Sequence, residues 1–160
     1  MEQSEHFLPV LNDWIAVFMH RSMQNLNRFS KEKGYSMSQI FALNFIHHHG
    51  TCGVSDLGEG MSVSNAAASQ LLEKLVQQQM IERTEDPEDR RGKQIRLTNK
   101  GDQIIRDSLF ARQSWLSELE SRLSSQEKEQ AISVLHLLIE KGRQIEFSKN
   151  SEYSSKTLNL

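Results

Sequence analysis

Apolar residues recur every three or four positions near the start of the chain, which is the spacing of one face of an α-helix. The apolar positions of this first predicted helix are Phe7, Leu8, Leu11, Trp14, Ile15, Phe18, Met19, Leu26 and Phe29. Gly34 is predicted to end the helix, because glycine readily takes the left-handed backbone of many helix ends. A second helix is predicted to start at Ser36 or Ser38, as its N-cap, and to stop at Gly50.

Two more helices are predicted between residues 54 and 79. A short one covers "VSDLGEGM", and a longer one begins with Ser62 or Ser64 as its N-cap. We expect the longer helix to face the core with Ala67, Leu71, Leu75 and Val76. Its opposite face is small and polar, and it consists of Asn65, Ala66, Ser69, Gln70, Lys74 and Gln77.

The pattern then changes to that of two short strands. "MIERTED" predicts the first, and "QIRLT" alternates so that Ile95 and Leu97 lie on one side of the second. The segment "PEDRRGK" between them contains Pro87 and Gly92, which favour a turn. The two strands are therefore predicted to form a β-hairpin with a long, charged tip.

Helical spacing returns after residue 100. Steps of four and three form a coiled-coil-like seam of Ile105, Leu109, Arg112, Leu116, Leu119 and Leu123. Arg112 is either a buried pairing residue at a dimer interface or, as we favour, a side chain whose charged end reaches solvent. "SSQE" at 124–127 is predicted to be a capping box. It starts a last helix with an apolar stripe of Ala131, Val134, Leu135, Leu138 and Ile139.

This order of elements predicts a mainly α fold with a small β-hairpin wing, which is a winged helix-turn-helix flanked by N- and C-terminal dimerisation helices. We assign residues 35–99 to the winged helix-turn-helix DNA-binding domain, 1–34 and 100–147 to the helical dimerisation region, and 148–160 to a flexible polar tail. The apolar seam and the last helix need a partner surface, so we expect a two-fold homodimer. Its two recognition helices would lie about 34 Å apart, one turn of DNA.

Composition agrees with a globular protein of the cytoplasm. Of the 160 residues, 37% are hydrophobic and 25% are charged. No apolar run reaches the length of a membrane span, and the N-terminus lacks the features of a signal peptide. Cys52 is the only cysteine, so an intramolecular disulfide is excluded. The net charge of −2 argues against a protein that coats nucleic acid by bulk charge, but it does not exclude a binder with a local basic surface.

Such a basic surface is concentrated in the second half of the predicted hairpin. From Arg90 to Lys100 there are five basic residues and no acidic one. A tip arginine can enter the minor groove of DNA, where negative potential is strongest. Lys93, Arg96 and Lys100 are predicted to contact phosphates, which fixes register without reading sequence.

The polar helix at 62–79 is suited to the major groove. Small side chains at Ala66, Ala68 and Ser69 let its backbone approach the DNA closely. Asn65 and Gln70 can bond base edges, because a carboxamide offers the donor and acceptor that match adenine.

The segment "RTEDPEDRRGKQIRLTNKG" closely resembles the wing signature of the MarR family of bacterial transcriptional regulators. The residues that carry the resemblance are Arg83, Asp89, Arg91, Leu97, Thr98 and Gly101. It implies a homodimer that binds a pseudo-palindromic operator in double-stranded DNA, usually as a repressor, and release in many members by a small, often aromatic ligand. It also implies that Arg91 is the minor-groove arginine, with Asp89 as its partner, and that 64–74 is the base-reading segment. The predicted DNA-binding residues are therefore Ser64, Asn65, Ala66, Ser69, Gln70, Lys74, Asp89, Arg90, Arg91, Lys93 and Arg96.

Three positions depart from the family pattern. Gln79 stands where the family usually has glycine before the first wing strand, and a left-handed backbone there would cost about 1 kcal/mol relative to glycine. Gly58 and Gly60 lie in the short supporting helix, which is expected to be loose as a result. The recognition helix has no arginine, so base preference is expected to depend on Gln70, Asn65 and DNA shape.

Other candidate sites are weaker. Histidines 47–49 invite a metal site, but three consecutive helix residues cannot all face one ion, so a solvated helix end is favoured. Cys52 is interpreted as a small turn residue rather than a peroxide sensor. A ligand pocket is weakly predicted from aromatic residues that are as consistent with core packing: Trp14, Phe18, Phe41 and Phe45.

The sequence thus predicts a homodimeric, sequence-specific DNA-binding regulator. It is not predicted to be an enzyme or to need a cofactor or a metal, since no phosphate loop, zinc-protease helix or nucleophile motif occurs. Two alternatives stay open: a winged-helix module that binds protein, and a regulator that senses a metal or an oxidant through its thiol.

Overall fold

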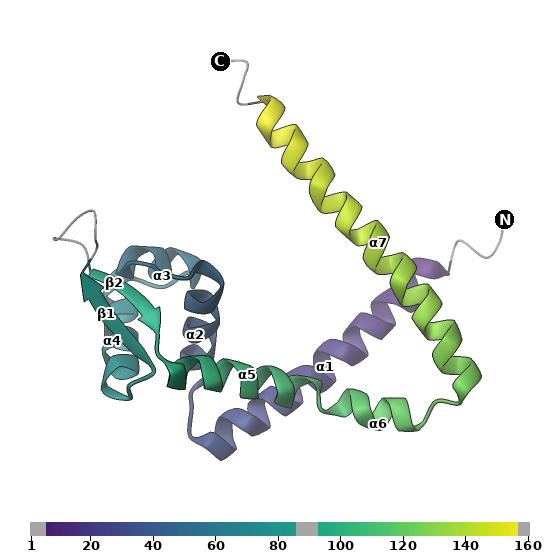
Figure 1. Cartoon of the computed structure of the whole chain (residues 1–160), viewed down its shortest axis with the longest axis horizontal. Coiled ribbons are helices and arrows are strands. Elements are labelled where there is room, and N and C mark those ends of the chain that lie inside the picture. The colour runs from purple at the N-terminus through teal and green to yellow at the C-terminus, as the bar shows by residue number, and fades with distance from the viewer. Residues whose placement is uncertain (1–5, 86–92, 157–160) are drawn as a thin grey trace. The chain divides into compact units, whose positions relative to one another are not determined.

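The computed structural model describes residues 6–85 and 93–156. It divides into two compact units, Met1–Trp115 and Leu116–Leu160, which are described here one at a time. The first unit holds most of the elements (Figure 1). They are α1 (Phe7–Lys33), α2 (Met37–His49), α3 (Val54–Gly60), α4 (Asn65–Gln77), β1 (Ile81–Glu85), β2 (Lys93–Leu97) and α5 (Asn99–Gln113).

The ends of the first two helices are as predicted. Gly34 ends α1 in the left-handed conformation, with φ of 73°. Ser36 caps α2: its hydroxyl accepts from the Gln39 main-chain N–H at 3.2 Å, and the Gln39 side chain accepts from the Ser36 main-chain N–H at 2.8 Å. This reciprocal pair satisfies two of the N–H groups that a helix start leaves without partners.

The predicted core face of α4 is wrong at two residues. Ala68 and Leu72 face the core in place of Ala67 and Leu71. Ala68, Leu72 and Leu75 are fully buried in the core, whereas Ala67 is exposed. Three consecutive alanines do not show which side of the helix faces the core. The adjacent apolar pairs later in the helix are compatible with either choice. The register is therefore decided by packing: Ala68 and Leu72 join a cluster with residues of α2, α3 and the hairpin.

The hairpin is antiparallel, with Ile81 opposite Leu97 and Arg83 opposite Ile95. Cys52 forms an isolated antiparallel β-bridge beside this two-stranded sheet, because its main chain exchanges two hydrogen bonds with Ile95, at 3.0 and 3.2 Å. Cys52 is thus bonded to β2 rather than placed in a plain turn. The predicted turn at 87–93 falls mostly on residues 86–92, which lie outside the described residues.

The two glycines of α3 allow close packing, in contrast to the loose helix that we expected. A Cβ at Gly60 would overlap the ring of Phe45, and a Cβ at Gly58 would lie 3.2 Å from the Val63 carbonyl oxygen. Leu57, on the same short helix, has no exposed surface. Glycine at both positions therefore brings α3 against α2 and against the turn that leads to α4.

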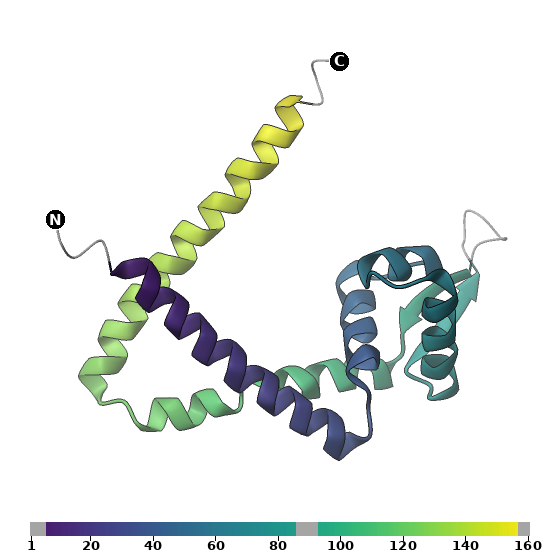
Figure 2. The same cartoon turned by 180° about the vertical axis from the view of Figure 1, so that it is seen from behind.

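Helix α5 crosses α1, as the opposite views of Figures 1 and 2 show. Ser22 of α1 and Ser108 of α5 are buried, and Asn25 Nδ2 donates to Ser114 Oγ at 3.0 Å. The continuous seam predicted from 105 to 123 is wrong, because α5 ends at Gln113 and α6 (Trp115–Ser121) begins after a break. The Ser114 hydroxyl donates to the Ala111 carbonyl oxygen at 2.9 Å, a local bond that competes with helix continuation.

The second unit consists mainly of α7 (Ser125–Lys156). Its predicted capping box is confirmed: Glu127 accepts from the main-chain N–H and the hydroxyl of Ser124, at 2.8 and 2.7 Å, and these bonds lower the pKa of Glu127. The helix continues past the predicted start of the tail at 148, since no glycine or proline follows Gly142. Residues 157–160 of that tail lie outside the described residues. No helix in the described ranges is long and apolar enough to cross a membrane.

Candidate nucleic-acid interface

Helix α4 presents one continuous polar face to solvent. Ser64 is its N-cap, and the Ser64 hydroxyl accepts from the Ala67 main-chain N–H at 3.2 Å. The residues predicted to read DNA from this helix are all exposed except Ser69, which is half-buried: Ser64, Asn65, Ala66, Ser69, Gln70 and Lys74. The structure therefore brings this part of the predicted site together on one surface.

The turn before α4 fixes where this face begins. Ser62 takes a left-handed backbone, with φ of 55°, and the next main-chain N–H, that of Val63, donates to the Gly58 carbonyl oxygen at 2.9 Å. A Cβ at Gly58 would come within 2.9 Å of Asn65 Oδ1. The absence of a side chain at residue 58 thus leaves room for the Asn65 carboxamide at the start of the helix.

A hollow of about 280 Å³ lies beside the exposed face of α4. It is lined by Ser36, Ser38, Met61, Val63, Ala67, Gln70, Leu71 and Lys74. Ser36 and Ser38 lie at the start of α2, and the sequence predicts only a helix-capping role for them. Their place beside Gln70 depends on how α2 packs on α4, which no local pattern shows.

The base of the wing carries an ion pair across its two strands. Arg96 Nε donates to Glu82 Oε1 at 2.7 Å, and the two residues are direct partners in the register. Both side chains are about half exposed, at 55% and 48%. The Arg96 charge is therefore partly neutralised within the hairpin. Lys93 opens β2, whereas Asp89, Arg90 and Arg91 lie outside the described residues.

Lys100, predicted to contact phosphate, is hydrogen-bonded within the protein. Its Nζ donates to the Gln78 carbonyl oxygen, just past the end of α4, at 2.8 Å. This partner could not be predicted from the sequence, because the contact joins residues 22 apart across the whole hairpin.

The four aromatic residues of the weakly predicted ligand pocket have different surroundings. Trp14 and Phe18 lie against Trp115, with ring centroids 6.1 and 5.8 Å apart. Phe45 instead stacks on His49 at 3.9 Å and packs on α3. Phe41 is 46% exposed. The structure thus places two of these residues on α1 and two on α2, so the four do not share one set of surroundings.

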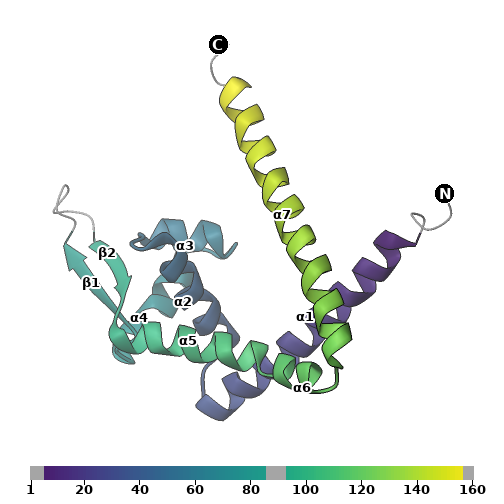
Figure 3. The ribbon, with the colours of Figure 1, turned by 45° about the vertical axis from the view of Figure 1, so that its right-hand side comes forward.

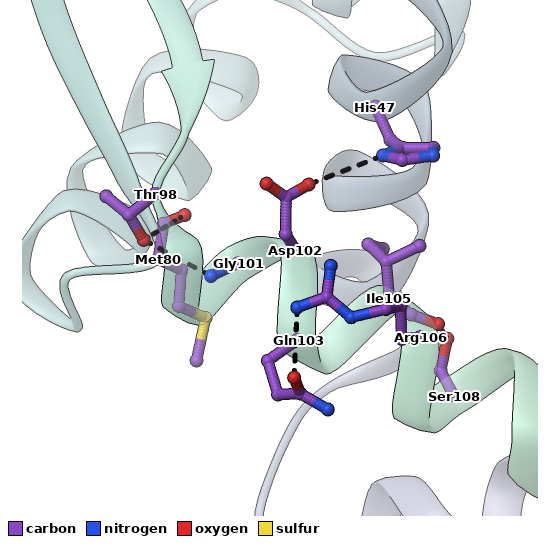
Figure 4. Close-up of polar contacts among 9 residues, drawn as sticks. All are labelled: His47, Met80, Thr98, Gly101, Asp102, Gln103, Ile105, Arg106 and Ser108. Atoms are coloured by element: carbon purple, nitrogen blue, oxygen red, sulfur yellow. Dashed lines mark hydrogen bonds and ion pairs between the residues drawn. The ribbon is translucent and has the colours of Figure 1, made fainter.

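The histidines of α2 each have a local contact. His47 lies 3.5 Å from an Asp102 oxygen of α5, as Figure 4 shows. His49 Nδ1 is 2.8 Å from the Phe45 carbonyl oxygen, and His47 and His48 meet edge to face. Within residues 6–85 and 93–156, no group of three or more histidine, cysteine, aspartate or glutamate side chains could hold a metal ion.

Cys52 is 5% exposed, and burial, followed by the Asp56 carboxylate, raises the pKa of its thiol. A reactive thiol needs the opposite setting, electropositive and accessible. The surroundings of Cys52 therefore favour an unreactive core residue.

Comparison with known proteins identifies a family. Residues 35–93 match the model of the MarR family. An uncharacterized HTH-type transcriptional regulator of Bacillus subtilis, YfiV, is 30% identical over 144 residues, which are 82% of this chain and 89% of that protein. The HTH-type transcriptional repressor MdtR of B. subtilis is 29% identical over 119 residues, 74% of this chain and 76% of its own.

Solved structures share the fold. The transcriptional regulator Tm0710 of Thermotoga maritima has a TM-score of 0.75 at 21% identity, over 90% of this chain and 98% of its own. A Staphylococcus aureus MepR mutant bound to an oligodeoxyribonucleotide has a TM-score of 0.67 at 21% identity, over 82% of this chain and 96% of its own.

Proposed function

The chain belongs to the MarR family of winged-helix transcriptional regulators, and we propose that it acts in the cytoplasm as a homodimeric repressor on a pseudo-palindromic DNA operator. The observation that carries the proposal is the exposed face of α4, which is small, polar and free of acidic side chains from Ser64 to Gln70. Such a face can approach base edges closely, and its carboxamides suit adenine. The repressor role is supported by relatives such as MdtR, which is named a repressor.

The homodimer is supported by apolar surface in both units. Along α1, the half-exposed or more exposed residues include Phe7, Leu8, Val10, Ile15, Val17 and Met19. In the second unit, the stripe of α7 keeps Val134, Leu135 and Ile139 between 45% and 54% exposed. Large apolar side chains exposed in such numbers along a helix are typical of an interface. We therefore keep residues 1–34 and 100–147 as the proposed dimerisation region.

A small, aromatic effector completes the proposal. What supports it is a hollow of about 290 Å³ between α1 and α5, beside the 77% exposed ring of Phe110. Its lining includes Asn25, Arg28 and Phe29, which offer an amide, a cation and a ring to a ligand. Effector binding between α1 and α5 would act on the helix that leads away from the wing.

The test is fluorescence anisotropy of the purified protein on the DNA upstream of its own gene, against scrambled DNA, over a salt series. Preferential binding with a steep salt dependence is expected, because phosphate contacts release counterions. Equal binding to both DNAs at every salt concentration would contradict the proposal. It would favour the alternative of a winged-helix module that binds protein, which a pull-down would then examine.

A further inference from the structure

Three consecutive main-chain carbonyls at the end of α4 are held by the start of α5. Lys100 Nζ donates to the Gln78 oxygen at 2.8 Å, and the Thr98 hydroxyl lies 2.8 Å from the Gln79 oxygen and 3.0 Å from the Met80 oxygen. The Thr98 main-chain N–H also donates to Met80, at 3.1 Å. Figure 4 shows Thr98 beside Met80 and Gly101, with dashed lines for its hydrogen bonds to both.

The same threonine begins α5. Its hydroxyl accepts from the Gly101 main-chain N–H at 3.2 Å, so that one side chain caps α5 and bonds the segment that follows α4. Gly101 lies so close to the Met80 carbonyl that a Cβ there would overlap its oxygen. The start of α5 therefore rests directly on the main chain that joins α4 to β1 (Figure 3).

The end of α4 is also held from the side of α2. Gln39 Nε2 donates to the Gln78 side-chain oxygen. Gln39 is only 6% exposed and forms the capping box of α2, so its position is fixed. Gln78 is thus bonded through its side chain to α2 and through its carbonyl to α5.

These contacts stabilise a segment whose backbone is unfavourable. Gln79 has φ of 57°, a left-handed conformation that is unfavourable for a residue with a side chain. Carbonyls at the end of a helix also lack partners unless other groups supply them. Because the donors come from α5, and α5 packs along α1, a shift of α5 would move the end of α4.

We propose that Thr98 and Lys100 are positioning residues, which set the orientation of the recognition helix from α5 and do not contact DNA. The inference rests on the proposed function and extends it, since it gives a route from the α1–α5 region to the DNA-reading face. Loss of these donors would lower affinity for the operator while leaving the electrostatic attraction to DNA unchanged.

The test compares Lys100→Met with Lys74→Met, a matched loss of one lysine charge from the exposed face of α4. Both variants are titrated with operator and scrambled DNA over a salt series. For Lys100→Met we expect roughly tenfold weaker operator binding, with the affinity for scrambled DNA and the salt slope unchanged. For Lys74→Met, the slope of the logarithm of affinity against the logarithm of salt concentration should become shallower by about one on both DNAs.

Thr98→Val and Thr98→Ser form the second arm, measured well below the unfolding temperature of each variant. Valine removes the hydroxyl and should reduce the ratio of operator to scrambled affinity, whereas serine should restore that ratio. A salt slope reduced by about one in Lys100→Met would overturn the proposal, because it would make Lys100 a phosphate contact. Unchanged operator affinity in both Lys100→Met and Thr98→Val would overturn it as well. If the wild type itself shows no operator preference, the proposed function fails, and this inference fails with it.

Discussion

Gln79 departs from local backbone preference, because it carries a side chain in a left-handed conformation. Its left-handed φ of 57° lies just past the C-cap of α4, and glycine, which has no Cβ, would adopt the same conformation without a steric clash. The neighbouring Gln78 has an ordinary φ of −84°. A glycine would therefore relieve an unfavourable backbone conformation at residue 79 but not at residue 78.

Gln79→Gly is expected to raise the free energy of unfolding by about 0.5–1 kcal/mol, because it relieves this conformation. Gln78→Gly, the comparison at an ordinary φ, should lower it, since glycine there adds freedom to the unfolded chain and removes the side-chain oxygen that accepts from Gln39. Urea denaturation followed by circular dichroism measures both. Equal or lower stability of Gln79→Gly would show that the backbone at 79 carries no cost.

Glu82 limits the charge of the wing through its contact with Arg96. Replacing it by glutamine should tighten binding to any DNA by roughly twofold to fivefold at low salt, with the gain fading as salt rises. The control is Glu118→Gln, which removes the same charge from an Arg122 pair at 2.6 Å in the second unit. An equal gain in both variants would indicate an effect of net charge alone.

At the scale of elements, the sequence predicted most helix and strand boundaries, because these depend on local chemistry. Ser36, Gly34 and the Ser124–Glu127 box end or begin helices through contacts within a few residues. The phase of α4 was missed, since it depends on packing between distant segments. The break at Ser114 was missed because the apolar spacing does not show the local bond of its hydroxyl to the Ala111 carbonyl oxygen. The same limit applies to the site: the exposed face of α4 was predicted from its polarity, whereas the Lys100 contact with Gln78 joins two helices and was not.

Helix α3 depends on glycine for its packing, so Gly60→Ala is expected to destabilise the first unit by about 1–3 kcal/mol through overpacking against Phe45. Gly142→Ala in α7 is the control. Apart from the adjacent backbone of α7 itself, no atom of the described residues lies within 4 Å of a Cβ at that position, and alanine favours a helix interior over glycine by up to about 1 kcal/mol. In thermal unfolding, Gly60→Ala should therefore lower the midpoint temperature and Gly142→Ala should raise it. A Gly60→Ala variant as stable as the wild type would mean that Phe45 moves aside freely.

At the scale of the whole molecule, the proposed dimer decides whether two recognition faces can act together. Leu135 lies on the apolar stripe of α7 and is 45% exposed, whereas Leu137, 53% exposed, lies off that stripe. We expect Leu135→Glu to weaken self-association by roughly tenfold or more and Leu137→Glu to change it little. Sedimentation equilibrium measures this directly. A Leu135→Glu protein that stays dimeric would remove α7 from the proposed interface.

The pairing of Cys52 with Ile95 has a consequence for the thermodynamics of binding. Two hydrogen bonds join the loop after α2 to the middle of β2, and Ile95 itself is 1% exposed. The base of the wing is therefore ordered when the chain folds, not when it meets a ligand. Since ordering a segment during association weakens the complex by its lost conformational entropy, this base enters binding already preorganised.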